Sequence, residues 1–248
     1  GPTFEESEIL SWPPERNSLA DLRWRVVRGG LRFGGTLSEG IALGLESGFD
    51  SGSTLDYIYR DQARGSGPLG RMIDRNYLDA IGWRGIRIRR THVRELLQLA
   101  ALHLHGEGRP VRVLDVAAGH GRYVLDALAQ GEQRADAITL RDFSERNVID
   151  GRKLISEFGA DDIATFEQGD AFDAASLAAL PVAPTLSTVS GLYELFADND
   201  AVLRSLQGIA AAMREGGYLV YTGQPWHPQL EFIARALTSH REGAAWVM

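Results

Sequence analysis

The 248-residue sequence contains no cysteine and a single lysine, Lys153. Without thiols the chain has no disulfide, no thiolate zinc site and no cysteine nucleophile. Its six histidines do not follow the spacing of metal ligands, so a metal site is not expected. The sequence also lacks an apolar run of about 18 residues and a charged-then-apolar leader, which predicts a cytoplasmic protein without a membrane span.

The positive charge is carried by arginine and is unevenly spread. The net charge of the chain is −7, yet the segment 71–94 holds seven arginines against two aspartates. Such a segment suits phosphate or carboxylate groups, although a solvated helix face is the commoner reason for a run of charge. The low basic charge of the whole chain disfavours stable binding of nucleic acid.

Residues 1–108 are predicted to form an N-terminal extension and a helical cap. Apolar residues recur at helical spacing over Leu37–Phe49 and again over Leu55–Leu104. The second stretch is interrupted by the turn-rich segment Ala63–Gly70. The chain shows no internal repeat and no low-complexity segment that would point to another architecture.

Residues 109–248 are predicted to form a separate domain in which strands and helices alternate. Strands are expected at 111–116, 135–140, 163–169, 185–191 and 218–223, and helices at 122–130, 144–159, 174–179, 200–214 and 229–238. Alternation with short connections predicts an α/β fold with a doubly wound, Rossmann-like parallel sheet. The C-terminal hairpin that usually completes such a sheet is missing, so the domain is expected to be truncated at its C-terminus.

The stretch VLDVAAGHGRYV, Val113–Val124, passes from a buried strand to a helix through a run of very small residues. Ligands of doubly wound sheets bind beyond the carboxyl ends of the strands, where small residues let them approach the backbone. A dinucleotide-binding turn would carry a third glycine where Val124 stands. The predicted contacts of this turn are Ala117, Ala118, Gly119 and Gly121, with Asp115 inside the strand.

The pattern Asp-x-Ala-x-Gly-x-Gly, from Asp115 to Gly121, resembles the first motif of class I S-adenosylmethionine-dependent methyltransferases. Ala117 stands in the place of a commoner glycine. The resemblance implies S-adenosylmethionine as the cofactor and S-adenosylhomocysteine as the product. The methionine part of this cofactor carries an ammonium group and no phosphate, so an acid near the turn is suitable where it would repel pyrophosphate.

Acidic residues also follow the next two strands. Asp142 ends the second strand, where its carboxylate can accept both ribose hydroxyls, and Phe143 beside it can flank the adenine. Asp170 follows the third strand and can accept the adenine amino group. Each acid alone could simply cap a helix or start a turn, but three at successive strand ends favour one site. The cofactor contacts predicted at these ends are Asp142, Phe143, Gly169, Asp170 and Ala171.

The fourth strand end, SGLYELF, resembles the segment of the same superfamily that runs under the methyl-transfer centre. Ser190, Gly191 and Tyr193 are expected to contact the cofactor, largely through the backbone. Glu194 and Tyr193 are the candidate catalytic residues, with Glu194 acting as a base or orienting the substrate. A solvated loop acid is an equally good interpretation of Glu194.

Longer segments are similar to a bacterial family of methyltransferases that is often joined to the C-terminal side of an α/β-hydrolase domain. The similarity is carried by SGFDSGSTLDYIYR, GPLGRMIDRNYLDAIGWRGIRIRR, SGLYELFADN and YTGQPWHPQLEFIARAL. The resemblance implies transfer of a methyl group by in-line displacement to a small-molecule or lipid acceptor, with a hydrolase as a possible partner domain. A nucleic-acid methyltransferase and a non-catalytic cofactor-binding module are the two alternatives.

Overall fold

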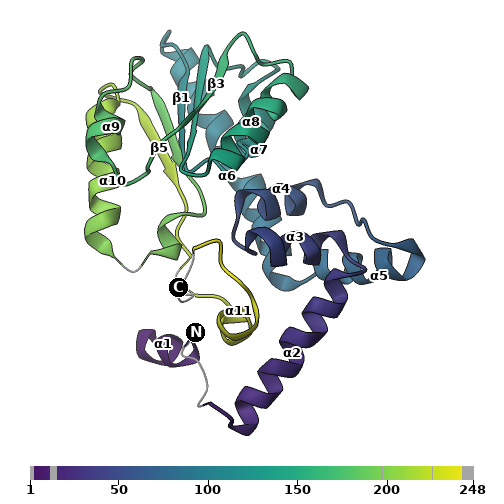
Figure 1. The fold of residues 1–248 in the computed structure, drawn as a ribbon. Helices are drawn as coiled ribbons and strands as arrows, with labels where there is room; N and C mark the ends of the chain where they lie inside the picture. The colour runs from purple at the N-terminus through teal and green to yellow at the C-terminus, as the bar shows by residue number, and fades with distance from the viewer. Residues whose placement is uncertain (1–2, 12–15, 197, 225, 242–248) are drawn as a thin grey trace. The chain divides into compact units, whose positions relative to one another are not determined.

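Two compact units form this chain in the computed structural model, which describes residues 3–11, 16–196, 198–224 and 226–241 (Figure 1). The sheet unit comprises residues 89–223, and the helical unit combines the described residues of 1–88 with those after 223. This division differs from the predicted boundary at residue 108. The reason is that the helix α6 (Ile81–Gly106) runs through the division between residues 88 and 89 and contributes residues to both units.

The sheet unit is built on five parallel strands in the order β3-β2-β1-β4-β5. These are β1 (Arg112–Val116), β2 (Ala137–Asp142), β3 (Ala164–Gln168), β4 (Leu186–Val189) and β5 (Tyr218–Tyr221). The winding direction changes between β1 and β4, where ligands of such sheets bind. The predicted doubly wound, Rossmann-like sheet is confirmed, and all five strands overlap their predicted ranges.

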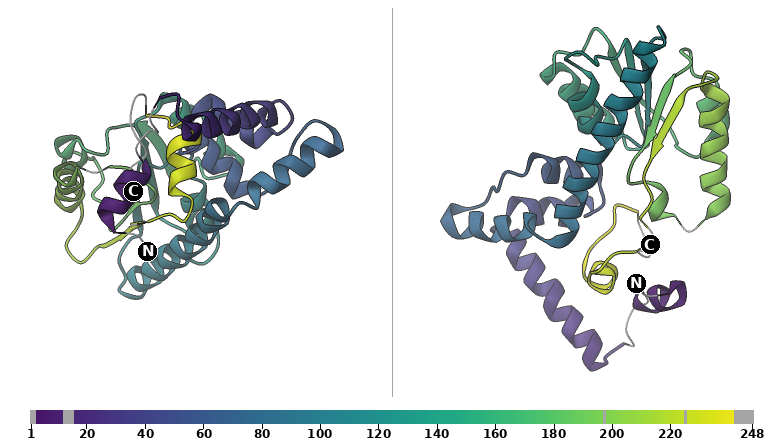
Figure 2. Two further views of the ribbon diagram at one scale, coloured as in Figure 1. Left: turned by 90° about the horizontal axis from the view of Figure 1, so that it is seen from below. Right: turned by 180° about the vertical axis from the view of Figure 1, so that it is seen from behind.

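Helices cover both faces of this sheet. Figures 1 and 2 show α9 (Ala174–Ala178) and α10 (Asn199–Ala212) on one face, and α7 (Arg122–Leu128) and α8 (Glu145–Glu157) on the other. On the first face, Leu114 of β1 packs with Leu177 and Ile209 in a buried apolar cluster. Removal of such side chains from water is the main stabilising contribution to this layer.

The helical unit contains α1 (Phe4–Ser11), α2 (Leu19–Gly35), α3 (Glu39–Ser47), α4 (Gly52–Arg60), α5 (Gly67–Leu78), the start of α6, and α11 (Leu230–Ala236). The helices predicted over 37–49 and 55–104 are present, whereas α2 was not predicted. In α2, the Trp24 side chain is buried and packs on Phe232. Arg28 of the same helix donates to the carbonyl oxygen of Arg235 at 2.8 Å. None of the helices described is both long enough and apolar enough to span a membrane.

The carboxylate of Asp50, which lies between α3 and α4, holds the last described residues in place within the helical unit. It accepts hydrogen bonds from the Ser239 hydroxyl at 2.6 Å and from the His240 backbone amide at 2.7 Å, and His240 Nδ1 lies 3.0 Å away. Burial by itself disfavours the charged carboxylate, but the hydrogen bonds from His240 and Ser239 and the charge of His240 outweigh it. The net result is that the pKa of Asp50 is lowered from 3.8.

A lowered pKa makes this contact sensitive to acid. Because the carboxyl is more acidic when folded, its stabilisation is present above about pH 4 and is lost as the pH falls further. We expect Asp50→Asn to lower the unfolding free energy by about 1–3 kcal/mol at pH 6, with the difference from the wild type shrinking toward pH 3. Urea unfolding across this range measures the effect, and a difference independent of pH contradicts it.

Candidate active site

The carboxyl ends of β1 to β4 lie at one edge of the sheet, and the residues predicted from the sequence gather there. The loop 117–121 follows β1, and Asp142 ends β2. Residues 169–171 follow β3 and residues 190–191 follow β4. Because neighbouring parallel strands end side by side, these four segments surround the switch point between β1 and β4.

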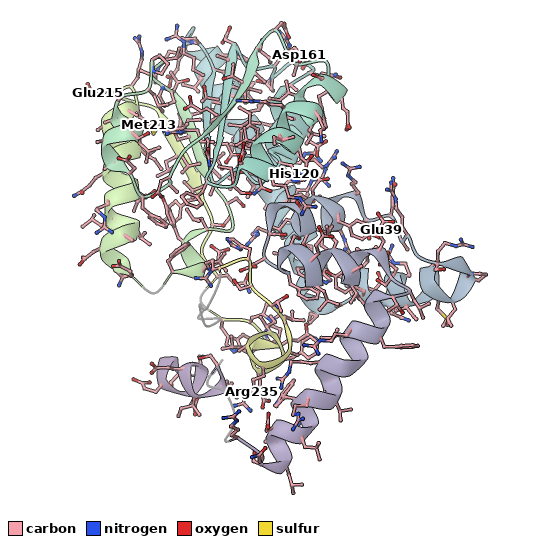
Figure 3. The ribbon with its side chains drawn as sticks, in the orientation of Figure 1. Glu39, His120, Asp161, Met213, Glu215 and Arg235 are labelled. Atoms are coloured by element: carbon pink, nitrogen blue, oxygen red, sulfur yellow. The ribbon has the colours of Figure 1, made fainter. Side chains whose placement is uncertain are left out.

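The loop after β1 has a backbone that suits very small residues (Figure 3 labels His120 within it). The φ angles are +59° at Ala117, +59° at Gly119 and +76° at Gly121, all in the left-handed region. A Cβ atom at position 121 would overlap the Leu140 side chain, so only glycine fits there. Ala117 lacks the freedom of glycine to adopt a positive φ angle, and its left-handed conformation costs about 1–2 kcal/mol. Strain of this kind is concentrated at functional turns.

The carboxylate of Asp142 connects this loop to the end of β2. One oxygen accepts from the Gly119 amide at 2.9 Å, and the other accepts from the Ser144 amide and from Asn147 Nδ2, both at 2.9 Å. The side chain is nearly buried. A carboxylate has about four acceptor positions, so these three donors leave about one for a ligand.

Asp115 lies below the loop and is completely buried. Its Oδ1 accepts from the Tyr123 hydroxyl at 2.5 Å, and its Oδ2 has no hydrogen-bond partner among the residues that the structure describes. Burial raises the pKa of Asp115 well above 3.8, while the hydrogen bond from Tyr123 lowers it and the charge of Asp142 raises it further. Tyr123 was not singled out from the sequence, because a tyrosine at the start of a helix carries no signal of its own.

The ends of β2 and β3 present an aromatic ring and an acid. Phe143 is 73% exposed, which is unusual for so large an apolar side chain. The backbone carbonyl oxygen of Phe143 accepts a hydrogen bond from Gln168 Nε2 at 2.8 Å. Asp170 is exposed, and its Oδ1 accepts from the Phe172 amide at 2.8 Å. The second oxygen of Asp170 remains available to a ligand.

Gly169 and Ala171 complete the end of β3. A Cβ at position 169 would overlap the guanidinium of the buried Arg141, which donates to the Ser176 hydroxyl at 2.6 Å. Ala171 is buried in the apolar cluster with Leu114. Both small residues are therefore required by packing on the sheet, whatever they also contribute to a ligand.

The segment after β4 turns sharply at Gly191, where φ is +80°. The Gly191 amide donates to Thr222 Oγ1 at 2.9 Å, which joins the ends of β4 and β5. The Tyr193 hydroxyl lies 3.0 Å from Ser205 Oγ on α10, and burial raises the pKa of Tyr193. This hydroxyl is directed into the α10 interface, while the backbone of Ser190 and Gly191 stays at the edge of the sheet.

Glu194 forms an ion pair with Arg89 of α6. Arg89 Nη1 donates to Glu194 Oε1 at 2.6 Å, and the side chains are only 17% and 3% exposed respectively. The Arg89 guanidinium also lies against Gly191, where an added Cβ would be 2.8 Å from Nη2. Arg89 was not distinguished from its neighbours in the sequence, since its partner lies 105 residues away.

The arginine-rich segment 71–94 is largely neutralised within the protein. Arg75 pairs with Asp61 and Asp79, and Arg87 donates to the Leu78 carbonyl oxygen. Further along, Arg89 pairs with Glu194, Arg90 contacts Asp126, and Arg94 donates to the Asp126 carbonyl oxygen. Among the described residues, only Arg71 and Arg84 of this segment lack such a partner. The segment therefore does not present a continuous basic surface.

A parallel sheet of order 3-2-1-4-5, a small-residue loop after its first strand and an acid ending its second together define a class I methyltransferase fold. All 248 residues match the protein family described as "Putative methyltransferase", and the chain belongs to this family. The predicted methyltransferase class is therefore confirmed, and with it S-adenosylmethionine as the cofactor of the family.

The chain is 52% identical over its full length to the "Uncharacterized protein YnbC" of Escherichia coli (strain K12), of which it spans 42%. Two solved structures are similar in part. A methyltransferase from Geobacter sulfurreducens in complex with S-adenosyl-L-homocysteine is 22% identical, with 52% of this chain and 47% of that chain covered and a TM-score of 0.39. An O-methyltransferase family protein from Burkholderia thailandensis is 16% identical, with coverages of 71% and 53% and a TM-score of 0.48.

Proposed function

We propose that this chain binds S-adenosylmethionine at the carboxyl edge of β1–β4 and transfers its methyl group to a small-molecule or lipid acceptor. The observation that carries the proposal is the hydrogen bond of Asp142 to the Gly119 amide, with the exposed Phe143 ring next in sequence. This bond fixes the small-residue loop against the end of β2. A preorganised loop beside an exposed ring suits a nucleoside joined to an amino acid.

The described residues fit the parts of this cofactor. The Asp142 carboxylate has about one acceptor position left for a ribose hydroxyl. The exposed Phe143 ring offers a face to the adenine, and the free oxygen of Asp170 accepts its amino group. The carboxyl of Asp115 is completely buried and joins β1 to the start of α7 through Tyr123.

The bound cofactor supplies a methyl group on a positively charged sulfur, already activated for displacement. The protein then contributes mainly alignment and exclusion of water, and alignment of two reactants is worth about 7–11 kcal/mol. The roles predicted for Tyr193 and Glu194 stay predictions. Because Ser205 and Arg89 hold these two side chains, a positioning role is favoured over proton transfer.

The nucleic-acid alternative loses its support, because most arginines of the segment 71–94 are paired within the protein. Incorporation of labelled methyl into an acceptor distinguishes an enzyme from a cofactor-binding module without turnover. Incubation with methyl-labelled cofactor and fractionated extract is expected to place label in the small-molecule or lipid fraction. Binding of the cofactor without incorporation into any fraction would favour the module, and label in RNA would restore the nucleic-acid alternative.

Phe143→Ala is expected to weaken S-adenosylmethionine binding by about 5- to 30-fold, because stacking of a base on an aromatic ring is worth about 1–2 kcal/mol. Since Phe143 is exposed, its removal should leave the thermal unfolding midpoint nearly unchanged. Leu203→Ala, at another exposed apolar residue of the sheet unit, is the matched control and should not alter binding. Calorimetric titration measures the affinity of both variants, and equal affinities would contradict the stacking of adenine on Phe143.

A further inference from the structure

A separate cavity of about 510 Å³ lies within the helical unit. Its walls come from the junction of α2 and α3, the loop before α5, and Arg71 of α5. The polar and charged side chains that line it are Thr36, Ser38, Glu39, Arg64, Ser66 and Arg71. Every residue of the wall belongs to the helical unit, so the cavity is distinct from the edge of the sheet described above.

A buried carboxylate holds the floor of this cavity in place. Asp74 is fully buried and accepts from the Ser38 hydroxyl at 2.5 Å and from the Arg64 amide at 2.8 Å. It also accepts from the Gly40 amide at 2.9 Å and the Tyr57 hydroxyl at 2.5 Å. Four donors satisfy this carboxylate completely, so the two wall segments are fixed relative to each other before any ligand arrives.

Close backbone packing fixes the loop as well. The Ser66 amide donates to the Leu37 carbonyl oxygen at 2.9 Å, and the Glu39 amide donates to the Arg64 carbonyl oxygen at 3.1 Å. A Cβ at Gly70 would overlap that same Leu37 carbonyl oxygen. The loop therefore presents Arg64, and α5 presents Arg71, from a rigid frame, although both side chains are themselves exposed.

The charges around the cavity favour an anion. Arg71 has no partner among the described residues, and Arg64 Nη1 is 3.8 Å from Glu39 Oε1, with both of these side chains about half exposed. Ser66 precedes α5 without making a side-chain capping bond, so its hydroxyl is free to donate into the cavity. Two guanidinium groups from separate segments, opposed by one carboxylate, leave a positive balance at the wall.

We propose that this cavity binds the phosphate group of a small organic phosphate through Arg64 and Arg71. A phosphate monoester carries close to two negative charges and pairs well with guanidinium groups. The cavity is far larger than a bare phosphate ion and falls in the range of small-molecule sites, so the ligand carries an organic part. Leu37, Ala42 and Ala63 supply apolar wall for that part.

Titration with glycerol 3-phosphate tests this site, with glycerol and inorganic phosphate as reference ligands. Glycerol 3-phosphate should bind more tightly than either reference. Arg71→Gln and Arg64→Gln should each weaken it by about tenfold, the value of one charge-assisted hydrogen bond. Glu39→Gln should strengthen it, because it removes the opposing charge. Arg84→Gln, at the other unpartnered arginine of the segment, is the matched control and should leave the affinity unchanged.

A second arm uses phosphatidylcholine vesicles with and without phosphatidic acid, since Leu69 and Met72 are exposed beside Arg71 on α5. Arg71-dependent binding to the phosphatidic acid vesicles alone supports the site with a lipid headgroup as its phosphate. Loss of affinity that is equal in the Arg71→Gln and Arg84→Gln variants overturns the proposal, as does failure of both arms. S-adenosylmethionine affinity, which these variants should not alter, reports separately on the sheet unit.

Discussion

Asp142→Ala is expected to lower the affinity for S-adenosylmethionine by about 100-fold, because a charged acceptor of one ribose hydroxyl contributes up to about 3 kcal/mol. The same change leaves the Gly119 amide, the Ser144 amide and Asn147 Nδ2 without their acceptor. Loss of these bonds releases the small-residue loop from β2. The unfolding free energy should therefore fall by about 3 kcal/mol as well. Calorimetric titration and urea unfolding measure the two effects.

The opposite end of the same strand provides a matched control. Asp136 immediately precedes β2, and its Oδ2 accepts from the Val111 amide at 2.7 Å. Asp136→Ala removes an aspartate that holds a neighbouring backbone amide, but at the amino end of the strand, away from the predicted site. It should lower stability and leave cofactor affinity unchanged. If Asp136→Ala weakens binding as much as Asp142→Ala does, the loss at Asp142 reflects general destabilisation and the ribose contact is contradicted.

The sheet could be predicted from the sequence because its signals are local. Each strand is a short apolar run bounded by turn residues, and Ser144 begins its helix by accepting from the Asn147 amide as a capping residue does. The helix α2 could not be predicted in the same way. Its paired glycines, Gly29–Gly30 and Gly34–Gly35, disfavour helix locally, whereas its stabilising partners Phe232 and Arg235 lie about 200 residues away in the chain.

The candidate site likewise has features that the sequence predicts and features that it does not. Positions at strand ends follow from topology alone, so the sequence predicts that Asp142, Asp170 and Gly191 lie at the carboxyl edge of the sheet, where β2, β3 and β4 end. The spacing of residues in the sequence does not predict the hydrogen-bond partners of the site residues. The pairing of Tyr193 with Ser205, of Asp115 with Tyr123 and of Glu194 with Arg89 depends on how helices dock on the sheet. Contacts of this kind decide whether a polar residue faces a ligand or the protein.

Arg89→Met is expected to lower the unfolding free energy by about 3–5 kcal/mol, because the Glu194 carboxylate would remain buried without its cation. Adding Glu194→Gln removes that uncompensated charge, so the double variant should be more stable than Arg89→Met alone. The sum of the two single effects should exceed the effect of the double variant by at least about 1 kcal/mol. Urea unfolding of the four proteins completes the cycle, and additive effects would show that the pair is not coupled.

The same four proteins distinguish positioning from proton transfer at Glu194. If the ion pair positions the segment after β4, Arg89→Met and Glu194→Gln weaken S-adenosylmethionine binding together, since Gly191 lies against the Arg89 guanidinium. The double variant should then recover part of that affinity. If Glu194 is instead a base, Glu194→Gln keeps wild-type affinity for S-adenosylmethionine and loses incorporation of labelled methyl. The buried, paired state of Glu194 favours the first result, and the second would return it to the catalytic role.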